Sequence, residues 1–322
     1  MKFKILPIAG DASIRKFYRI FLNNKKKILI TSEKEKYRNL ISYSTINKFL
    51  RLNKLNAPKL YEHNISKGII IIEDFGDLSF NKVLLKNENK FKIYKKLVDL
   101  LLRIQKIIPP KKIKSFNKKF HFMKKYSNKY LFEESNLFFD WYLPVFMSKK
   151  KALNIKKKSN KILLKLYNKL NFPNSYFCHR DYHVENLIKT KGKIGIIDSQ
   201  DAMIGNPAYD LVSLIDDVRI KTSNKLKNKI YNYYLTKKFK NKKMKHKEFL
   251  EDFNTLSVQR NLKIIGIFSR LYIRDNKKKY LKFIPYTWKL LEMRMNSEPF
   301  LELKKIFNDN IRKKVKKNTK FK

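Results

Sequence analysis

One stretch in the second half of the chain carries the residues best suited to chemistry. Residues 178–188 read Cys-His-Arg-Asp-Tyr-His-Val-Glu-Asn-Leu-Ile, and Gly-Ile-Ile-Asp follows at 195–198. Transfer of a phosphoryl group needs an acid near the attacking hydroxyl and oxygen ligands that hold Mg²⁺ against nucleotide phosphates. The residue types and their spacing predict that Asp181 is the catalytic base and that Asn186 and Asp198 bind Mg²⁺.

A short hairpin is expected to bring the two predicted metal ligands together. Lys191-Gly192 can form the tight turn, which would pair Leu187 with Ile196. Asp198 then lies at the open end of the hairpin, beside Asn186. Because Mg²⁺ prefers one or two carboxylates plus phosphates and waters, this small set of ligands is sufficient.

The histidines beside the predicted base have a structural interpretation. His179 and His183 flank Asp181 and, with Cys178, suggest a zinc site, but no further cysteine stands at zinc spacing. We expect His179 to support the catalytic loop by hydrogen bonding. Further on, Asn206-Pro207 is typical of a helix start, which places Asp210 in the first turn as a second supporting residue.

The elements around this stretch indicate an α+β fold with a small β-rich part and a larger helical part. A hairpin of strands 17–22 and 28–31, a helix over about 37–55 and a strand over 68–76 come first, and helices near 91–107, 157–170 and 225–237 follow. We expect an N-lobe over 1–76 and a helical C-lobe over 77–322, with the catalytic loop at 178–201 and a basic tail from about 311 to 322.

The composition of the chain limits the kinds of partner that we expect it to bind. The chain has 76 Lys and Arg against 27 Asp and Glu, a formal net charge of +49, which is typical of nucleic-acid binders. The basic residues are spread over the whole chain, however, and Lys, Asn, Ile, Phe and Tyr all have A/T-rich codons, so a bias in nucleotide composition explains the charge. We expect no nucleic-acid or membrane partner and, from the single cysteine and the lack of a long apolar run, a cytoplasmic protein.

The nucleotide site has no familiar phosphate loop. Neither Gly-x-x-x-x-Gly-Lys-Ser/Thr nor Gly-x-Gly-x-x-Gly occurs, which argues against a P-loop fold. The candidate turn over the phosphates is 9–13, Ala-Gly-Asp-Ala-Ser, directly before the first strand of the hairpin. An ordinary turn explains that segment equally well.

Four blocks of sequence, in order along the chain, resemble the aminoglycoside phosphotransferase-like kinase superfamily, and within it the bacterial cell-wall amino-sugar kinases. They are Gly10–Arg19, Ile71–Asp77, the catalytic segment through Ala202, and Gln259–Leu271. The resemblance implies a bilobal protein-kinase-like fold, ATP and Mg²⁺ as cofactors, and phosphorylation of the anomeric hydroxyl of N-acetylmuramate or N-acetylglucosamine in peptidoglycan recycling.

The same resemblance implies further site residues. The segment Glu73, Asp74 and Phe75 would be the hinge whose backbone meets adenine, and Ser13 would lie near the phosphates. Candidate sugar ligands are Arg260, Asn261 and Arg270, although a packing helix with a solvated polar face explains most of their segment.

Two departures and two alternatives stay open. Ser199 stands where the family usually has an aromatic residue, and strand 28–31 offers no lysine for the α and β phosphates. One alternative keeps the mechanism but changes the acceptor to an aminoglycoside or another small alcohol. The other is a catalytically idle kinase-fold scaffold or basic nucleic-acid-binding protein, which would show salt-sensitive oligonucleotide binding and no ATP turnover.

Overall fold

The structure is a computed structural model that describes residues 4–8, 15–22, 25–33, 37–240, 243–319 and 321. Contacts within the chain divide it into two compact units, which are described separately. The first unit consists of Met1–Lys124 and Tyr176–Ile204, and the second of Lys125–Ser175 and Gly205–Lys322. The predicted lobes at 1–76 and 77–322 stay a prediction.

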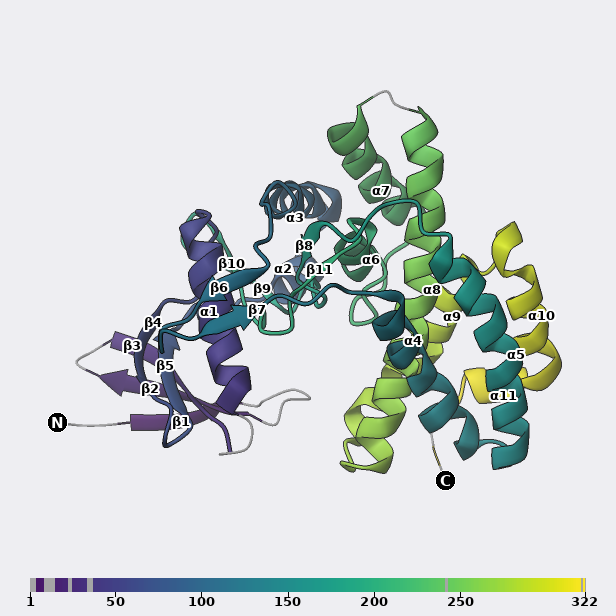
Figure 1. Cartoon of the computed structure of the whole chain (residues 1–322), viewed down its shortest axis with the longest axis horizontal. Coiled ribbons are helices and arrows are strands. Elements are labelled where there is room, and N and C mark those ends of the chain that lie inside the picture. Colours follow the sequence, from purple (N-terminus) through teal and green to yellow (C-terminus); the bar gives the residue numbers. More distant parts are fainter. Residues whose placement is uncertain are drawn as a thin grey trace. The chain divides into compact units, whose positions relative to one another are not determined.

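The first unit contains a five-stranded antiparallel sheet in the order β1-β2-β3-β5-β4 (Figure 1). Its strands are β1 Lys4–Ile8, β2 Lys16–Leu22, β3 Lys25–Thr31, β4 Leu60–Asn64 and β5 Ile69–Glu73. The predicted hairpin is β2 and β3, and the predicted strand after the first helix is β5. The two outer strands were missed, because β1 is mostly exposed and β4 reads Leu-Tyr-Glu-His-Asn without an apolar alternation.

One helix, α1 (Tyr37–Leu52), packs against this sheet. The shared core consists of Ile28, Ile30, Leu40, Tyr43, Ile70 and Ile72. Alternate residues of a strand face the same side, so the isoleucines of β3 and β5 form one apolar surface. The helix ends three residues before the predicted end, since Asn53 and Lys54 form a turn in which Lys54 has a φ of 59°.

Short elements complete the first unit. They are α2 Phe80–Leu85, α3 Lys90–Ile104, β6 Lys112–Lys114, β7 Phe120–Phe122, β8 Tyr176–Cys178, β9 Leu187–Lys189 and β10 Ile194–Ile196, together with the first two residues of β11 Met203–Gly205. Strands β9 and β10 form the antiparallel hairpin that was predicted, with Leu187 opposite Ile196. Gly192 turns this hairpin with a φ of 73°, a conformation that glycine adopts without strain.

The second unit is helical within the part of the chain that the structure describes. It consists of α4 Asn128–Leu137, α5 Lys149–Asn168, α6 Ala208–Ile215, α7 Asn224–Phe239, α8 Lys243–Ile273, α9 Ile284–Arg294, α10 Leu301–Asn310 and α11 Lys313–Lys316, with short turns at Phe138–Tyr142, Leu143–Val145, Lys278–Phe283 and Glu298–Phe300. The α5 helix starts eight residues before the predicted start, because Ser148 caps it by accepting a hydrogen bond from the backbone of Lys151.

The long helix α8 is the centre of the second unit (Figure 1) and packs against α4, α6 and α9. Gly266 lets α8 approach the end of α4 closely. A Cβ atom on Gly266 would lie 2.3 Å from the backbone carbon of Leu137 and 2.5 Å from the backbone nitrogen of Phe138. Glycine weakens a helix interior, so this close approach explains why it is found here.

The single cysteine and the helices bear on the expected environment of the chain. Cys178 is a free cysteine and is buried, as expected for a small apolar side chain. None of the described helices combines the length and the apolar content that crossing a membrane requires.

Candidate active site

The predicted catalytic loop, between β8 and β9, is organised around the side chain of Asn186. Its Nδ2 donates a hydrogen bond to the backbone oxygen of Asp181 at 3.0 Å and lies 3.3 Å from Nε2 of His183. The backbone nitrogen of Asn186 also donates to the backbone oxygen of His183 at 3.0 Å. These bonds fix the loop across the five residues from the predicted base to the first predicted metal ligand.

The hairpin carries the second predicted ligand to the same place. The backbone nitrogen of Ile197 donates to the backbone oxygen of Asn186 at 3.1 Å, one step beyond the last paired residues of β9 and β10. His179 is buried and its Nε2 lies 3.0 Å from the backbone oxygen of Ile197, so it supports the end of β10. The structure therefore brings Asp181, Asn186 and Asp198 together in one hydrogen-bonded segment.

Asp198 has an unusual backbone and an unusual charge environment. Its φ is 62°, in the left-handed region that non-glycine residues rarely occupy and that is found often at functional sites. Desolvation is the largest influence on its pKa and raises it, the Arg15 guanidinium opposes this, and the charge of Asp181 raises it further. A carboxylate in such a position favours a nearby cation.

Arg15, which sequence reasoning did not single out, provides a cation at this position. Its NH2 donates to Oδ1 of Asp198 at 3.1 Å, and only 7% of the arginine is exposed. The guanidinium carbon lies 5.5 Å from the ring centres of both Phe17 and Tyr43. Burial raises the pKa of Tyr43 to about 12, so its hydroxyl stays neutral.

Two further contacts hold the segment that follows Asp198. The hydroxyl of Ser199 is buried and donates to Oδ1 of Asn47 on α1 at 2.8 Å. The guanidinium of Arg180 donates to the backbone oxygen of Asp201 at 3.0 Å. Ser199 therefore ties the segment after Asp198 to α1.

The predicted hinge is built around an arginine on β2. Arg19 makes paired hydrogen bonds to Asp74, at 2.6 and 3.1 Å, and to Asp77, at 2.7 and 2.9 Å. The hydrogen bonds from Arg19 hold the pKa of Asp77 below its usual value. The carboxylate of Glu73 accepts from the backbone nitrogen of Lys59 at 3.2 Å. The carboxylates of Glu73 and Asp74 are therefore already hydrogen-bonded within the predicted hinge segment.

Phe75 packs directly on the hairpin of the catalytic segment. A Cβ atom on Gly195 of β10 would lie 2.5 Å from Cδ2 of the Phe75 ring. Glycine is needed at this position because any side chain would displace the ring. The third hinge residue therefore couples the hinge to the strand that leads into Asp198.

Ser13 and the rest of the predicted phosphate-covering turn lie outside the described residues. The other predicted nucleotide contacts are in the first unit, as are Asp181, Asn186 and Asp198. The three predicted sugar ligands are all on α8, in the second unit.

The three residues on α8 have different environments. Arg260 is 4% exposed, and no other residue in the described part of the chain makes an ion pair or hydrogen bond with its guanidinium. Asn261 is buried and donates to the backbone oxygen and the hydroxyl of Ser257 at 2.8 and 3.2 Å. Arg270 is partly buried, which lowers its pKa. Of the three, Arg260 has the environment most suited to binding an anionic group.

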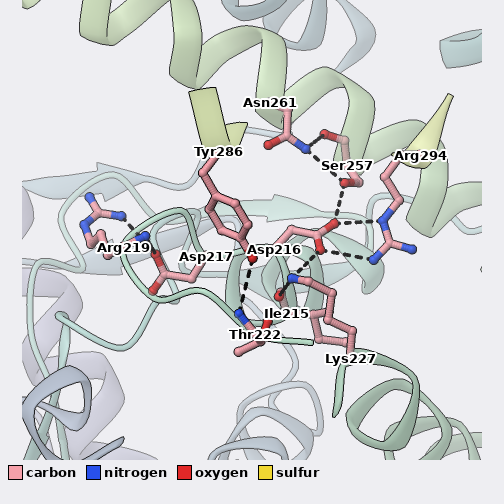
Figure 2. Close-up of polar contacts among 10 residues, drawn as sticks. All are labelled: Ile215, Asp216, Asp217, Arg219, Thr222, Lys227, Ser257, Asn261, Tyr286 and Arg294. Carbon is pink, nitrogen blue, oxygen red and sulfur yellow. Dashed lines mark hydrogen bonds and ion pairs between the residues drawn. The ribbon is translucent and has the colours of Figure 1, made fainter. Parts of the chain in front are cut away.

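Asn261 belongs to a buried network around Asp216, another residue that sequence reasoning missed (Figure 2). Oδ2 of Asp216 accepts from the hydroxyl of Ser257 at 2.7 Å and from Arg294 at 2.9 Å, and Oδ1 lies 3.1 Å from the amino group of Lys227. Burial would raise the pKa of Asp216, but the two cations lower it well below its usual range. The network joins the end of α6 to α7, α8 and α9.

The helix start before Asp210 is close to the prediction. Oδ1 of Asn206 accepts from the backbone nitrogen of Ala208 at 2.9 Å, and its Nδ2 donates to Asp252 at 2.6 Å. The helix α6 begins at Ala208, one residue later than predicted, and buries Asp210 in its first turn. The supporting role of Asp210 stays a prediction.

Two of the missed residues had a signal in the sequence. Phe17 and Arg19 are two apart on β2 and share one face of the strand, and Arg15 is the residue before the strand begins, with its guanidinium over the Phe17 ring. Two arginines four positions apart are an evident match for the acidic segment of Asp74 and Asp77. Asp216 had no comparable signal, because its partners are 11, 41 and 78 positions away.

The side chains of Asn186 and Asp198 suit a hard cation. Within the described ranges, no three His, Cys, Asp or Glu side chains form a cluster that could hold a metal ion. Asn186 and Asp198 offer an amide oxygen and a carboxylate, which are ligands that Mg²⁺ accepts together with phosphate oxygens and waters. The residues present thus fit a magnesium ion that arrives with a nucleotide.

Comparison with known sequences identifies the family. Residues 4–240 match the sequence profile of the "Phosphotransferase enzyme family". The chain belongs to this phosphotransferase family. As a member it is a small-molecule kinase, with a nucleotide and a small-molecule acceptor as ligands.

Two curated relatives of this phosphotransferase have the same name. The N-acetylmuramate/N-acetylglucosamine kinase of Caulobacter vibrioides is 28% identical over 265 residues, which cover 81% of this chain and 72% of the relative. The kinase of that name from Neisseria meningitidis is 26% identical over 286 residues, 88% of this chain and 83% of the relative. The predicted resemblance to the amino-sugar kinases is confirmed.

Solved structures confirm the predicted fold class. Plasmodium vivax ethanolamine kinase superposes with a TM-score of 0.62 at 13% identity, covering 91% of this chain and 82% of that one. The aminoglycoside phosphotransferase APH(2'')-Ib with bound ADP gives a TM-score of 0.61 at 14% identity, covering 90% and 92%. The phosphotransferase therefore has the protein-kinase-like fold of these enzymes, with its N-terminal sheet followed by a mostly helical region.

Proposed function

We propose that this phosphotransferase is an ATP-dependent sugar kinase that phosphorylates the anomeric hydroxyl of N-acetylmuramate and N-acetylglucosamine. The observation that carries the proposal is the hydrogen-bonded segment in which Asn186 fixes the loop of Asp181 and lies beside Asp198. The acceptor comes from the curated relatives, whose matches cover most of this chain.

Asp181 acts as the base in this proposal. Its carboxylate accepts or orients the proton of the sugar hydroxyl, while the bonds from Asn186 and the neighbouring His183 hold its backbone in place. Asn186, through Oδ1, and Asp198 would hold Mg²⁺. The metal would supply positive charge against the phosphate oxygens, where negative charge develops during transfer.

The hinge binds the base of the nucleotide through its backbone. Asp74 and Glu73 are engaged by Arg19 and Lys59, so their carboxylates have structural roles. Among the described residues, none forms a hydrogen bond with the backbone nitrogen or oxygen of Phe75. We assign adenine recognition to those two groups.

The acceptor site uses an arginine of α8. N-acetylmuramate carries a lactyl carboxylate that N-acetylglucosamine lacks, and a guanidinium matches a carboxylate with two parallel hydrogen bonds. Arg260, buried and without an ion-pair partner among the described residues, is our candidate for this contact. Asn261 and Arg270 have supporting roles on the same helix.

Acceptors of other kinds define the alternatives. The fold neighbours include an ethanolamine kinase and aminoglycoside phosphotransferases, so an amino alcohol or an aminoglycoside belongs in any test. An idle scaffold is less well supported, because the chain retains the complete Asp181, Asn186 and Asp198 set. We place the reaction in the cytoplasm, where ATP is available.

The test is ATP consumption by the purified protein in the presence of Mg²⁺. N-acetylmuramate, N-acetylglucosamine, kanamycin and choline are supplied separately, with Asp181→Asn as the inactive variant and Asp140→Asn, at an exposed acid of the second unit, as the matched control. Turnover with the amino sugars that is lost in Asp181→Asn alone supports the proposal. Turnover with kanamycin or choline only would reassign the acceptor, and ATP binding without any turnover would favour the idle scaffold.

A further inference from the structure

We propose that Arg15 is the residue that binds the nucleotide phosphates in this chain, and that it exchanges its bond to Asp198 for those phosphates. The proposal rests on the kinase function proposed above. It fills a gap that the sequence leaves, because β3 carries no lysine in the segment 28–31 where protein kinases place their phosphate-binding lysine.

The lysines that β3 does carry lie at the wrong end of the strand. Lys27 is opposite Glu73, the last residue of β5, which is at the hinge. Its amino group pairs with Glu62 at 3.1 Å and lies 5.0 Å from the ring centre of Tyr61. Lys26 lies over the ring of Phe21 on the neighbouring strand. All the lysines of β3 therefore lie at its start, and the end of the strand at Thr31 carries none.

Arg15 lies at that other end. Lys16, the next residue, is opposite Thr31, the last residue of β3. The Arg15 guanidinium is in direct contact with the predicted metal ligand, 3.1 Å from Oδ1 of Asp198. The rings of Phe17 and Tyr43 hold it at 5.5 Å each, a distance at which a cation is attracted to an aromatic face.

The two ends of the path from the predicted hinge to Asp198 are occupied by Arg19 and Arg15. Arg19, on β2, contacts Asp74, and Arg15, the residue before the strand begins, contacts Asp198. At about 3.3 Å per residue of extended chain, four residues span at most roughly 13 Å. A nucleotide is elongated, with its base at one end and its phosphates at the other. Such a molecule, bound by the hinge through its base, presents its phosphates at the Arg15 end.

The chemistry of the guanidinium suits an exchange of partners. Arginine is always charged, and its planar fork of donors matches phosphate as well as carboxylate. A metal held by Asp198 also takes phosphate oxygens as ligands, which places the phosphates next to the carboxylate that Arg15 already contacts. A metal bound to Asp198 would supply the counter-charge that Arg15 supplies there, and the Arg15 guanidinium would then be available to the phosphates with each charge still compensated.

The test compares binding of ATP, ADP and adenosine by titration calorimetry, in Mg²⁺ and again in EDTA, to wild type, Arg15→Met and Arg15→Lys. Lys27→Met is the matched control, a lysine on the neighbouring strand at the hinge end. We expect Arg15→Met to weaken ATP binding by about 10- to 100-fold in Mg²⁺, where a metal would take the place of Arg15 at Asp198, and to have a smaller effect in EDTA. Adenosine binding should change by less than about 2-fold, and Arg15→Lys should lie in between. Lys27→Met should leave the ATP-to-adenosine ratio unchanged.

Adenosine binding also shows that each variant is folded at the hinge. If Arg15→Met does not fold, the ratio of ATP to adenosine affinity in Arg15→Lys decides. ATP affinity that stays at the wild-type level, or falls only in step with adenosine affinity, would overturn the inference while leaving the proposed function intact. A wild-type protein that binds adenosine and ATP equally would overturn it too, and one that binds neither would overturn the proposed function with it.

Discussion

Replacing Asp216 by Asn should destabilise the second unit strongly, although the two side chains have nearly the same shape. Asp216 is 1% exposed and is the shared counter-charge of Lys227, which is 3% exposed, and of Arg294 (Figure 2). A neutral amide would leave two cations close together without the carboxylate that compensates them. Removing one partner from a buried ion pair typically costs about 3–5 kcal/mol of folding free energy.

The two tryptophans make this loss measurable in the second unit alone. Trp141 and Trp288 both lie there, so tryptophan fluorescence during denaturation reports the unfolding of that unit. For a unit of about 170 residues, each kcal/mol corresponds to about 2–4 °C, so the melting temperature should fall by roughly 6–20 °C. Asp140→Asn is the matched control, because its pair with Lys156 is exposed and worth about 0–1 kcal/mol.

Two further results would test the reasoning. Adding Lys227→Met to Asp216→Asn should recover part of the loss, since it removes one uncompensated cation. The network holds the pKa of Asp216 below its unfolded value, so its contribution is complete above about pH 4 and is lost as the pH falls further. The difference between wild type and Asp216→Asn should shrink below that pH. A loss no larger than that of Asp140→Asn would refute the account of this network.

Three more substitutions have definite expected outcomes. Gly266→Ala should destabilise the second unit by about 1–3 kcal/mol by tryptophan fluorescence, because its Cβ would overlap the backbone of α4; an unchanged or higher stability would contradict this contact. Gly195→Ala should weaken ATP binding several-fold in calorimetry by displacing Phe75, and adding Phe75→Leu should restore part of it; full binding by the single variant would count against the hinge contact. Arg260→Met should raise KM for N-acetylmuramate about 10-fold or more in steady-state assays and leave KM for N-acetylglucosamine nearly unchanged, whereas equal changes would remove Arg260 from carboxylate recognition.

Local patterns in the sequence were enough to predict the elements that position the catalytic segment. Continuous runs of apolar residues indicated β3 and β5, and the Lys191-Gly192 turn gave the pairing of the β9 and β10 hairpin. The start of α5 was missed, because the lysines of 149–158 obscure an apolar face whose buried members include Ala152 and Ile155. An outer strand such as β4, with few buried residues, gives no comparable pattern.

Contacts between distant parts of the chain could not be predicted in the same way. Arg15 and Asp198 are 183 positions apart, and only the folded sheet and hairpin bring them together. Glu73 and Asp74 could be assigned to a hinge by resemblance. Their hydrogen bonds with Lys59 and Arg19 depend on strand register, which the local sequence does not give.

The most direct test of the central claim is to identify the reaction product. Purified protein is incubated with ATP, Mg²⁺ and N-acetylmuramate or N-acetylglucosamine, and the product is analysed by phosphorus and proton NMR for coupling between the phosphate and the anomeric proton. The account predicts a sugar 1-phosphate that forms with wild type and is absent with Asp181→Asn. Phosphate at another hydroxyl would contradict the proposed site of transfer, and a product formed equally by Asp181→Asn would contradict the assignment of the base.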